Sequence, residues 1–286
     1  MQESLFILGQ KMAPQHLISR AAGRIANSRN PNIRDRFIRW FIERYGVDMS
    51  EAAEPDPLKY DSFNDFFTRA LKPGARPFDS TPEALTCPAD GAISQIGQIE
   101  QGRIFQAKGQ EFTLSQLLGE PESDLHAFDQ GHFATIYLSP RDYHRVHMPV
   151  TGTLEKMTFI PGQLFSVNPV TAERVPALFA RNERVVAWFK TDVGPVAMVL
   201  VGAMIVASIA TVWDGVVAPG GQQVQRSEYH GNEAITLEKG DEMGRFLLGS
   251  TVILITPKHT TRWQPQYRAG SQVRMGETLG AILPPV

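Results

Sequence analysis

The 286-residue chain lacks several features that would place it in a common class of protein. Its single cysteine, Cys87, excludes an internal disulfide and a thiolate metal cluster, which fits a reducing compartment. The first 30 residues lack the unbroken apolar core of a signal peptide, because Lys11, Arg20 and Arg24 interrupt it. We therefore expect a cytoplasmic protein.

Charge is distributed unevenly along the chain. Residues 1–50 contain eight Lys or Arg and four Asp or Glu, a net charge of +4. Because the whole chain carries −2, the remainder carries −6. A basic front on an acidic body suggests an anionic partner for the front, either a membrane surface or nucleic acid.

The residues from Val193 to Trp213 include no charged side chain, and this length would suffice for a transmembrane helix. However, the run is rich in Val, Ile and Thr, which favour strands. Its flanks are Asp192 and Asp214 rather than the Lys or Arg expected beside a membrane span. A buried pair of strands is the favoured prediction, with a membrane span as the alternative.

The first third of the chain has the apolar periodicity of amphipathic helices. Two interpretations stay open: helices packed on a core, or helices lying in a lipid interface, for which Arg and Trp40 are typical. The three apolar stripes are Ile18, Ala21, Ala22, Ile25 and Ala26; Phe37, Ile38, Phe41, Ile42 and Tyr45; and Phe63, Phe66, Phe67 and Leu71.

From about residue 84 the chain changes to short β-rich runs separated by Gly, Pro and Asp. These patterns predict an α+β protein, with a helical region at 1–83, for which membrane docking is one of the two interpretations, and a β-rich body at 84–286. We expect the body to be a mainly antiparallel β barrel or sandwich. KGDEMG at 239–244 and MGETLG at 275–280 share a turn pattern, which suggests a duplicated hairpin unit.

Two histidines, His144 and His147, occur in SPRDYHRVHMP at 139–149. We expect no metal there, because no cysteine or convincing third ligand is nearby and the HExxH pattern is absent. This segment forms a polar cluster between apolar strands, which is unusual for packing alone. The cluster consists of Arg141, Asp142, Tyr143, His144 and His147. A solvated loop is the alternative explanation.

An acid, a base and a hydroxyl that could activate one another are present in Asp90, His147 and Ser250. Ser250 lacks the G-x-S-x-G pattern of an α/β-hydrolase. It follows Gly249 within RFLLGSTVILITP, where a glycine interrupts an apolar strand. A serine hydroxyl can attack the preceding carbonyl, and the resulting ester can open by β-elimination to leave an N-terminal pyruvoyl group.

LGST at 248–251, HRVHMP at 144–149, PADG at 88–91 and FFTRALKPGARPFD at 66–79 together closely resemble the bacterial phosphatidylserine decarboxylase family. The resemblance extends over essentially the whole chain. It implies self-cleavage between Gly249 and Ser250, which would give chains 1–249 and 250–286. It also implies that Asp90 orients His147 and stabilises its charge, while His147 takes the proton from Ser250.

The resemblance further implies that Ser250 becomes a pyruvoyl cofactor, which forms a Schiff base with the amine of phosphatidylserine and assists its decarboxylation to phosphatidylethanolamine. We expect His144 to assist decarboxylation or the following protonation. Ser166 and Asn168, in FSVNP, are candidate head-group donors. The expected partners are phosphatidylserine, an anionic membrane surface at the cytoplasmic face of the cell membrane, and the second cleavage product, with further homo-oligomerisation open.

Two other functions stay open at this point. One is a pyruvoyl decarboxylase of a soluble amino acid, which would not need the basic front. The other is a non-catalytic β module of lipoyl-like type, suggested by the repeated turn pattern. A serine hydrolase would require some other presentation of Ser250.

Overall fold

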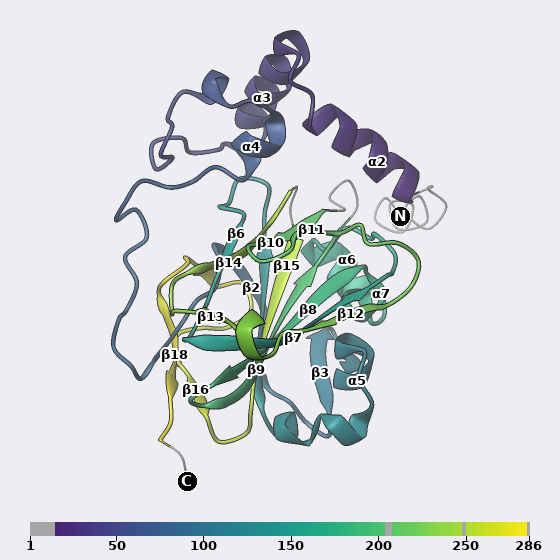
Figure 1. Cartoon of the computed structure of the whole chain (residues 1–286), viewed down its shortest axis with the longest axis vertical. Helices are drawn as coiled ribbons and strands as arrows, with labels where there is room; N and C mark the ends of the chain where they lie inside the picture. The colour runs from purple at the N-terminus through teal and green to yellow at the C-terminus, as the bar shows by residue number, and fades with distance from the viewer. Residues whose placement is uncertain (1–14, 204–207, 248–249, 285–286) are drawn as a thin grey trace.

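The computed structural model describes residues 15–203, 208–247 and 250–284 and comprises a group of N-terminal helices beside a large β-rich body (Figure 1). Asn30 caps the second of the long helices through the backbone NH of Asn32, and Gly46 ends it with a φ of 66°. The elements of this group are α2 (Gln15–Ala26), α3 (Pro31–Tyr45), η1 (Pro57–Lys59) and α4 (Phe63–Phe67).

The helices have a small aromatic core of their own. Ile38 and Phe41 of α3 are buried against Phe63, Phe66 and Phe67 of α4. The predicted third stripe therefore packs against the second. It also reaches the body, because the Phe67 ring lies 3.9 Å, centroid to centroid, from the ring of His144.

The body is built from antiparallel sheets. The largest, with nine strands, has the order β12 (Gln225–Glu228), β7 (Gly152–Ile160), β8 (Arg184–Thr191), β9 (Gly194–Val201), β15 (Ser250–Thr256), β5 (His132–Leu138), β2 (Gly91–Gln98), β17 (Gln272–Val273), with β13 (Ile235–Leu237) also on β7. A four-stranded sheet has the order β11 (Gly215–Ala218), β10 (Ile209–Thr211), β14 (Glu242–Phe246), β6 (Arg145–His147).

Two smaller sheets and several short helices complete the body. The smaller sheets are β1 (Ala84–Thr86), β18 (Thr278–Ile282), β16 (Thr261–Trp263) and the pair β3 (Arg103–Ala107), β4 (Gln110–Thr113). The helices are α5 (Leu114–Leu118), η2 (Glu122–Asp124), η3 (His126–Phe128), α6 (Pro169–Arg174), α7 (Leu178–Arg181) and η4 (Gly231–Glu233).

The large sheet has a hydrophobic core on each face, because successive side chains of a strand point to opposite sides. In β15, Val252 and Leu254 belong to a core shared with the four-stranded and three-stranded sheets. Ile253 and Ile255 belong to a second core shared with α5, α7 and β3–β4. The body is therefore a sandwich of sheets with short helices on its outer face.

The structure confirms the predicted fold class: N-terminal amphipathic helices precede a mainly antiparallel, sandwich-like body. The sheets are open, so the sandwich describes the body and the barrel does not. The uncharged run at 193–213 contains strands β9 and β10, but they belong to different sheets and do not pair. No helix among the described residues is long and apolar enough to cross a membrane.

The turn pattern that residues 239–244 and 275–280 share forms the same turn twice in the structure. Gly240 and Gly276 have φ values of 91° and 89°, which favour glycine. Each turn exchanges two backbone hydrogen bonds with an earlier segment, so CPADG at 87–91 and MPVTG at 148–152 are equivalent. The bonds are Gly240 N to Met148 O (2.9 Å), Met148 N to Asp241 O (2.9 Å), Gly276 N to Cys87 O (2.9 Å) and Cys87 N to Glu277 O (2.7 Å).

Candidate active site

The predicted cleavage bond lies in the connection between two sheets. Phe246, at the end of β14, belongs to the four-stranded sheet, whereas Ser250 begins β15 in the nine-stranded sheet. Ser250 pairs with Leu138, the last residue of β5. Gly249 lies outside the described residues, and Ser250 is placed here by its backbone register alone.

The polar segment at 139–149 contacts both sides of this connection. It begins directly after Leu138, the partner of Ser250. At its other end, the carbonyl of His144 accepts a hydrogen bond from Phe246 N (3.0 Å), and β6 pairs with β14. The topology thus brings the HRVH sequence close to position 250, although about one hundred residues separate them in the chain.

His147 is held as a neutral base. Its Nδ1 contacts the carbonyl of Gly240 (2.8 Å), and its Nε2 contacts the hydroxyl of Tyr143 (3.0 Å). Because a carbonyl only accepts, the proton is on Nδ1 and the lone pair is on Nε2. Burial lowers the pKa of His147 below its usual range, more than the opposing bond to Gly240 raises it. His147 is therefore ready to accept a proton at neutral pH.

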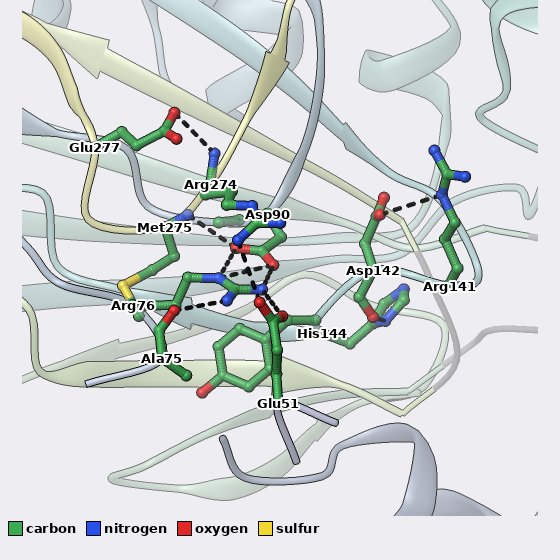
Figure 2. A network of polar contacts seen from close by, with 12 residues as sticks. Glu51, Ala75, Arg76, Asp90, Arg141, Asp142, His144, Arg274, Met275 and Glu277 are labelled. Atoms are coloured by element: carbon green, nitrogen blue, oxygen red, sulfur yellow. Dashed lines mark hydrogen bonds and ion pairs between the residues drawn. The ribbon is translucent and has the colours of Figure 1, made fainter. Parts of the chain in front are cut away.

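Asp90 lies at the centre of an ion-pair network with Arg76 and Glu51 (Figure 2). Its carboxylate accepts hydrogen bonds from Arg76 Nε (3.0 and 3.1 Å), from Arg76 Nη2 (2.5 Å) and from the backbone NH of Met275 (2.9 Å). Arg76 also pairs with Glu51 (2.8 Å). The orienting hydrogen bond that the resemblance implies between Asp90 and His147 is absent here, because both ring nitrogens of His147 have other partners.

The repeated turn explains part of what Asp90 does. In the equivalent segment, Thr151 Oγ1 accepts a hydrogen bond from Lys239 N (3.1 Å), as Asp90 accepts one from Met275 N. The side-chain acceptor is thus common to both copies, and the negative charge is special to Asp90. That charge still acts on His147 through space, where it favours the protonated ring. The two segments also touch, since His147 N donates to the carbonyl of Pro88 (2.8 Å).

His144 is fully buried. Its Nδ1 donates to the carbonyl of Asp142 (2.8 Å; Figure 2). Its Nε2 has no hydrogen-bond partner among the described residues. Burial, helped by the positive charge of Arg69, lowers the pKa of His144 to about 3. The ring is therefore neutral, and its Nε2 keeps a lone pair that no described residue uses.

Of the two candidate head-group donors, Asn168 has a structural use. Its Oδ1 caps α6 by accepting from Thr171 N (3.0 Å) and Thr171 Oγ1 (2.7 Å), so only its amide nitrogen remains as a donor. Ser166 is half-buried in the same segment. This segment is fixed to the rim of the large sheet by Asn182, whose Nδ2 donates to Phe165 O (2.8 Å) and Gly202 O (2.9 Å).

Sequence reasoning assigned no role to the arginines that surround the site. Arg76 forms an ion pair with Asp90, and the buried side chain of Arg69 makes only one donor bond in the described structure, from Nη2 to the carbonyl of Arg141 (3.1 Å). The available signal was Arg69 itself, a charged residue directly after the apolar FFT. The described residues contain no group of three or more His, Cys, Asp or Glu side chains that could hold a metal.

Position 250 lies at a junction between two sheets, and the segment that carries the neutral histidines His144 and His147 contacts both sides of this junction. A family model described as phosphatidylserine decarboxylase matches residues 63–281, and a second, described as PSD, matches residues 5–46. The chain belongs to the phosphatidylserine decarboxylase family.

Curated relatives match over nearly the full length. The chain is 59% identical over 283 residues to the phosphatidylserine decarboxylase proenzyme of Marinobacter nauticus, covering 99% of both chains. It is 59% identical over 280 residues to that of Bordetella pertussis, covering 97% of this chain and 94% of the relative. It is 55% identical over 281 residues to that of Hahella chejuensis, covering 98% and 95%.

Proposed function

We propose that this protein converts phosphatidylserine to phosphatidylethanolamine, using a pyruvoyl group made from its own Ser250. The observation that carries the proposal is the position of residue 250, where β15 begins beside the segment that holds His144 and His147. Family membership supports the decarboxylation of phosphatidylserine. The sheet junction supports cleavage at Gly249–Ser250.

In the proposed cleavage, the Tyr143 hydroxyl releases His147 Nε2, which then takes the proton of the Ser250 hydroxyl, with the negative charge of Asp90 favouring the protonated ring. The oxygen bonds to the carbonyl carbon of Gly249, His147 gives its proton to the leaving nitrogen, and the peptide C–N bond breaks, which leaves an ester. Loss of the Cα proton and of the ester oxygen from Cβ releases the Gly249 carboxylate and leaves dehydroalanine at 250. Water then replaces its nitrogen, which leaves as ammonia, and a pyruvoyl group remains.

The pyruvoyl group would supply a carbonyl that accepts electrons from the lipid amine as carbon dioxide leaves. The residues present fit such a group, since residue 250 is fixed by β5 on one side and its strand by β9 on the other. His144 is neutral at rest, with its proton on Nδ1, and its Nε2 lone pair has no partner among the described residues and would handle the proton of the substrate. We therefore assign His144 to the decarboxylation and His147 to the cleavage.

The N-terminal helices would dock the enzyme on the anionic cytoplasmic face of the membrane as a peripheral protein. The outer face of α3 exposes Ile33 and Trp40, which are 47% and 50% accessible although large and apolar. Arg36, Arg39 and Arg44 are exposed on the same helix. Apolar side chains flanked by arginine are what an anionic bilayer surface binds.

Intact mass spectrometry of the purified protein tests the proposal. We expect two polypeptides, 1–249 and 250–286, with the smaller blocked at its N-terminus by the pyruvoyl group. Ser250→Ala should give one uncleaved, inactive chain. The matched control Ser227→Ala changes an exposed serine of β12 and should cleave normally. A single unmodified wild-type chain in an active sample would show that the proposed cleavage is wrong.

A further inference from the structure

Glu183 is a buried acid that the proposed reaction does not yet use. It directly precedes β8 and is only 2% exposed. Its Oε1 has no hydrogen-bond partner in the part of the chain that the structure describes. Burial raises the pKa of Glu183 to about 7. A carboxyl group with this pKa can both accept and donate a proton at neutral pH.

The sheet register places Glu183 in line with residue 250. Val201 pairs with Arg184 on one side and with Thr251 on the other. One position further, Gly202 N donates to the carbonyl of Glu183 (2.9 Å), so the alignment continues beyond the last paired residues. Positions 183, 202 and 250 therefore form one row across three neighbouring strands.

This row lies on the face of the large sheet that meets the four-stranded sheet. Val185 and Ala187 of β8 belong to the core between the two sheets, as do Leu200 and Val252. By alternation, position 183 faces the same interior as position 250. The residue between them is Gly202, which contributes no side chain. Two strand spacings separate positions 183 and 250, about 10 Å of backbone distance.

The charged side chains near Glu183 are engaged elsewhere. Arg184 points to the opposite face and donates to the carbonyls of Leu117 (2.7 Å) and Gln116 (2.6 Å). Arg181 donates to Gln163 Oε1 (2.9 Å). Across the layer, Arg245 pairs with Glu242 (2.7 Å) and the neutral His144 carries no charge. Among the described residues Glu183 therefore has no cation that would commit it to a structural ion pair.

We propose that Glu183 is a further acid–base residue of the centre at residue 250, where it exchanges the proton of the lipid's primary amine. This assignment rests on the proposed function. The Glu183 assignment adds to the proposed function the group that deprotonates the substrate amine. In the proposed function, His147 serves the cleavage and His144 the later proton transfer.

The proton balance is as follows. The lipid amine arrives as an ammonium group, and the Glu183 carboxylate takes one of its protons. The free lone pair then forms a C–N bond to the carbonyl carbon at residue 250. The former carbonyl oxygen receives one proton from the nitrogen and the returned proton from Glu183, and it leaves as water when its C–O bond breaks. One proton is borrowed and returned, one water is released, and no oxidant or reductant is required.

The first test measures amine capture by Glu183→Gln, with phosphatidylserine in detergent micelles so that membrane docking plays no part. Borohydride trapping followed by the mass of chain 250–286 reports the bond to residue 250. We expect capture to slow by roughly 100-fold, a usual size for loss of a general base. In the wild type the capture rate should rise with pH through about 7, because the carboxylate is the active form, and the variant should lose this rise.

Two controls separate a proton-transfer role from a structural one. Hydroxylamine is largely unprotonated at neutral pH and does not need the first deprotonation, so Glu183→Gln should slow its capture much less than it slows the capture of phosphatidylserine. Glu120→Gln removes another buried acid, one that pairs with Lys156 (2.9 Å), and should leave phosphatidylserine capture unchanged. Equal slowing of both amines by Glu183→Gln, or no slowing of either, would overturn the assignment.

Cleavage and titration provide independent readouts. Glu183→Gln should still give chains 1–249 and 250–286, whereas an uncleaved wild type would instead refute the proposed function. In the Ser250→Ala chain, infrared difference spectra should show a carboxyl group titrating near pH 7. Adding Glu183→Gln should remove that signal. If the Ser250→Ala chain has no such signal, the proposal is wrong whether or not the Gln variant folds.

Discussion

His144 packs against Phe67 with its ring fully buried, and this burial links the residue to stability as well as to chemistry. In the unfolded chain its pKa returns to about 6.5, whereas in the folded chain it is about 3. Between these values the unfolded state binds a proton that the folded state does not. Stability contributed by the neutral ring is therefore complete above pH 6.5 and is lost as the pH falls toward 3.

His144→Gln should reduce this acid sensitivity. For the uncleaved Ser250→Ala chain, protonation of the unfolded His144 lowers the free energy of unfolding by about 2 kcal/mol between pH 7 and pH 5. Urea unfolding at the two pH values should show a smaller loss in the His144→Gln background. His230→Gln, which alters an exposed histidine, should retain the full loss. An identical loss in all three chains would contradict a neutral, buried His144.

At the residue scale, the sequence indicated which segments form the site, but it did not indicate which side chains bond to one another there. The candidates His144, His147 and Ser250 come from segments that the topology brings together. The bonds of Asp90 were unpredictable because they depend on Arg76 and on the turn at Met275, which are close only in the folded chain. Glu183 gave no sequence signal, since its importance comes from burial and register.

Among the elements, α2 and α3 show what helical periodicity leaves open. Ile38 and Phe41 of α3 are buried, as the apolar stripe predicts. Ile25, a member of the stripe on α2, is instead 51% exposed. A stripe of apolar residues indicates a face that avoids water, but it does not distinguish a protein core from a lipid surface. Exposure in the folded chain is the additional observation that favours the membrane.

The double variant Ile33→Ser/Trp40→Ser should weaken binding to phosphatidylserine-containing vesicles at least 10-fold, because each buried large apolar side chain contributes about 1.5–3 kcal/mol. Vesicle co-sedimentation at low salt measures the change. These exposed positions suit the test better than truncation of residues 1–45, which would remove Ile38 and Phe41 from the helical core.

Phe105→Ser/Val224→Ser is the matched control for this test, because it removes two comparably exposed apolar side chains from the body. Its vesicle binding should equal that of the wild type. The docking assignment fails if the helix variant also binds as the wild type does, or if both variants lose binding equally.

Strand content was predictable from residues 84 onward, but strand partners were not. Alternation and β-branched residues indicate that β9 and β10 are strands, yet neither property says which strand lies beside another. The connection between them changes sheets, as the one between β14 and β15 does. The repeated turn pattern was the one sequence feature that indicated which distant segments are structurally equivalent. The same pattern also suggested a non-catalytic module, but membership of a decarboxylase family argues against that function for the whole chain.

For the whole molecule, the important feature is the place of β15 inside the large sheet. Its residues pair with β5 from Ser250 to Thr256 and with β9 from Thr251 to Ile255. The same C-terminal segment also supplies β16, β17 and β18. After the proposed cleavage, chain 250–286 would still contribute β15 and β17 to the nine-stranded sheet and β16 and β18 to the three-stranded sheet. Its separation from chain 1–249 would therefore disrupt both sheets.

This arrangement predicts different refolding kinetics for cut and uncut protein. After unfolding in urea and dilution, the Ser250→Ala chain should recover its native fluorescence at a rate independent of protein concentration. The cleaved protein must bring two chains together, so its rate should increase with concentration and its yield should be lower. Equal, concentration-independent recovery of both would show that chain 250–286 is not required to complete the body.

The central position of β15 also implies that maturation of the enzyme would be irreversible, with folding first and cleavage second. Translation begins a chain with methionine, so residue 250 can acquire its reactive end only after a continuous precursor has folded around it. After the proposed cleavage, the central strand would no longer be joined covalently to the rest of the body, so refolding would require two chains to meet. Damage severe enough to unfold the body would then be remedied by new synthesis rather than by repair, and the supply of active enzyme would follow the rate at which precursors are made.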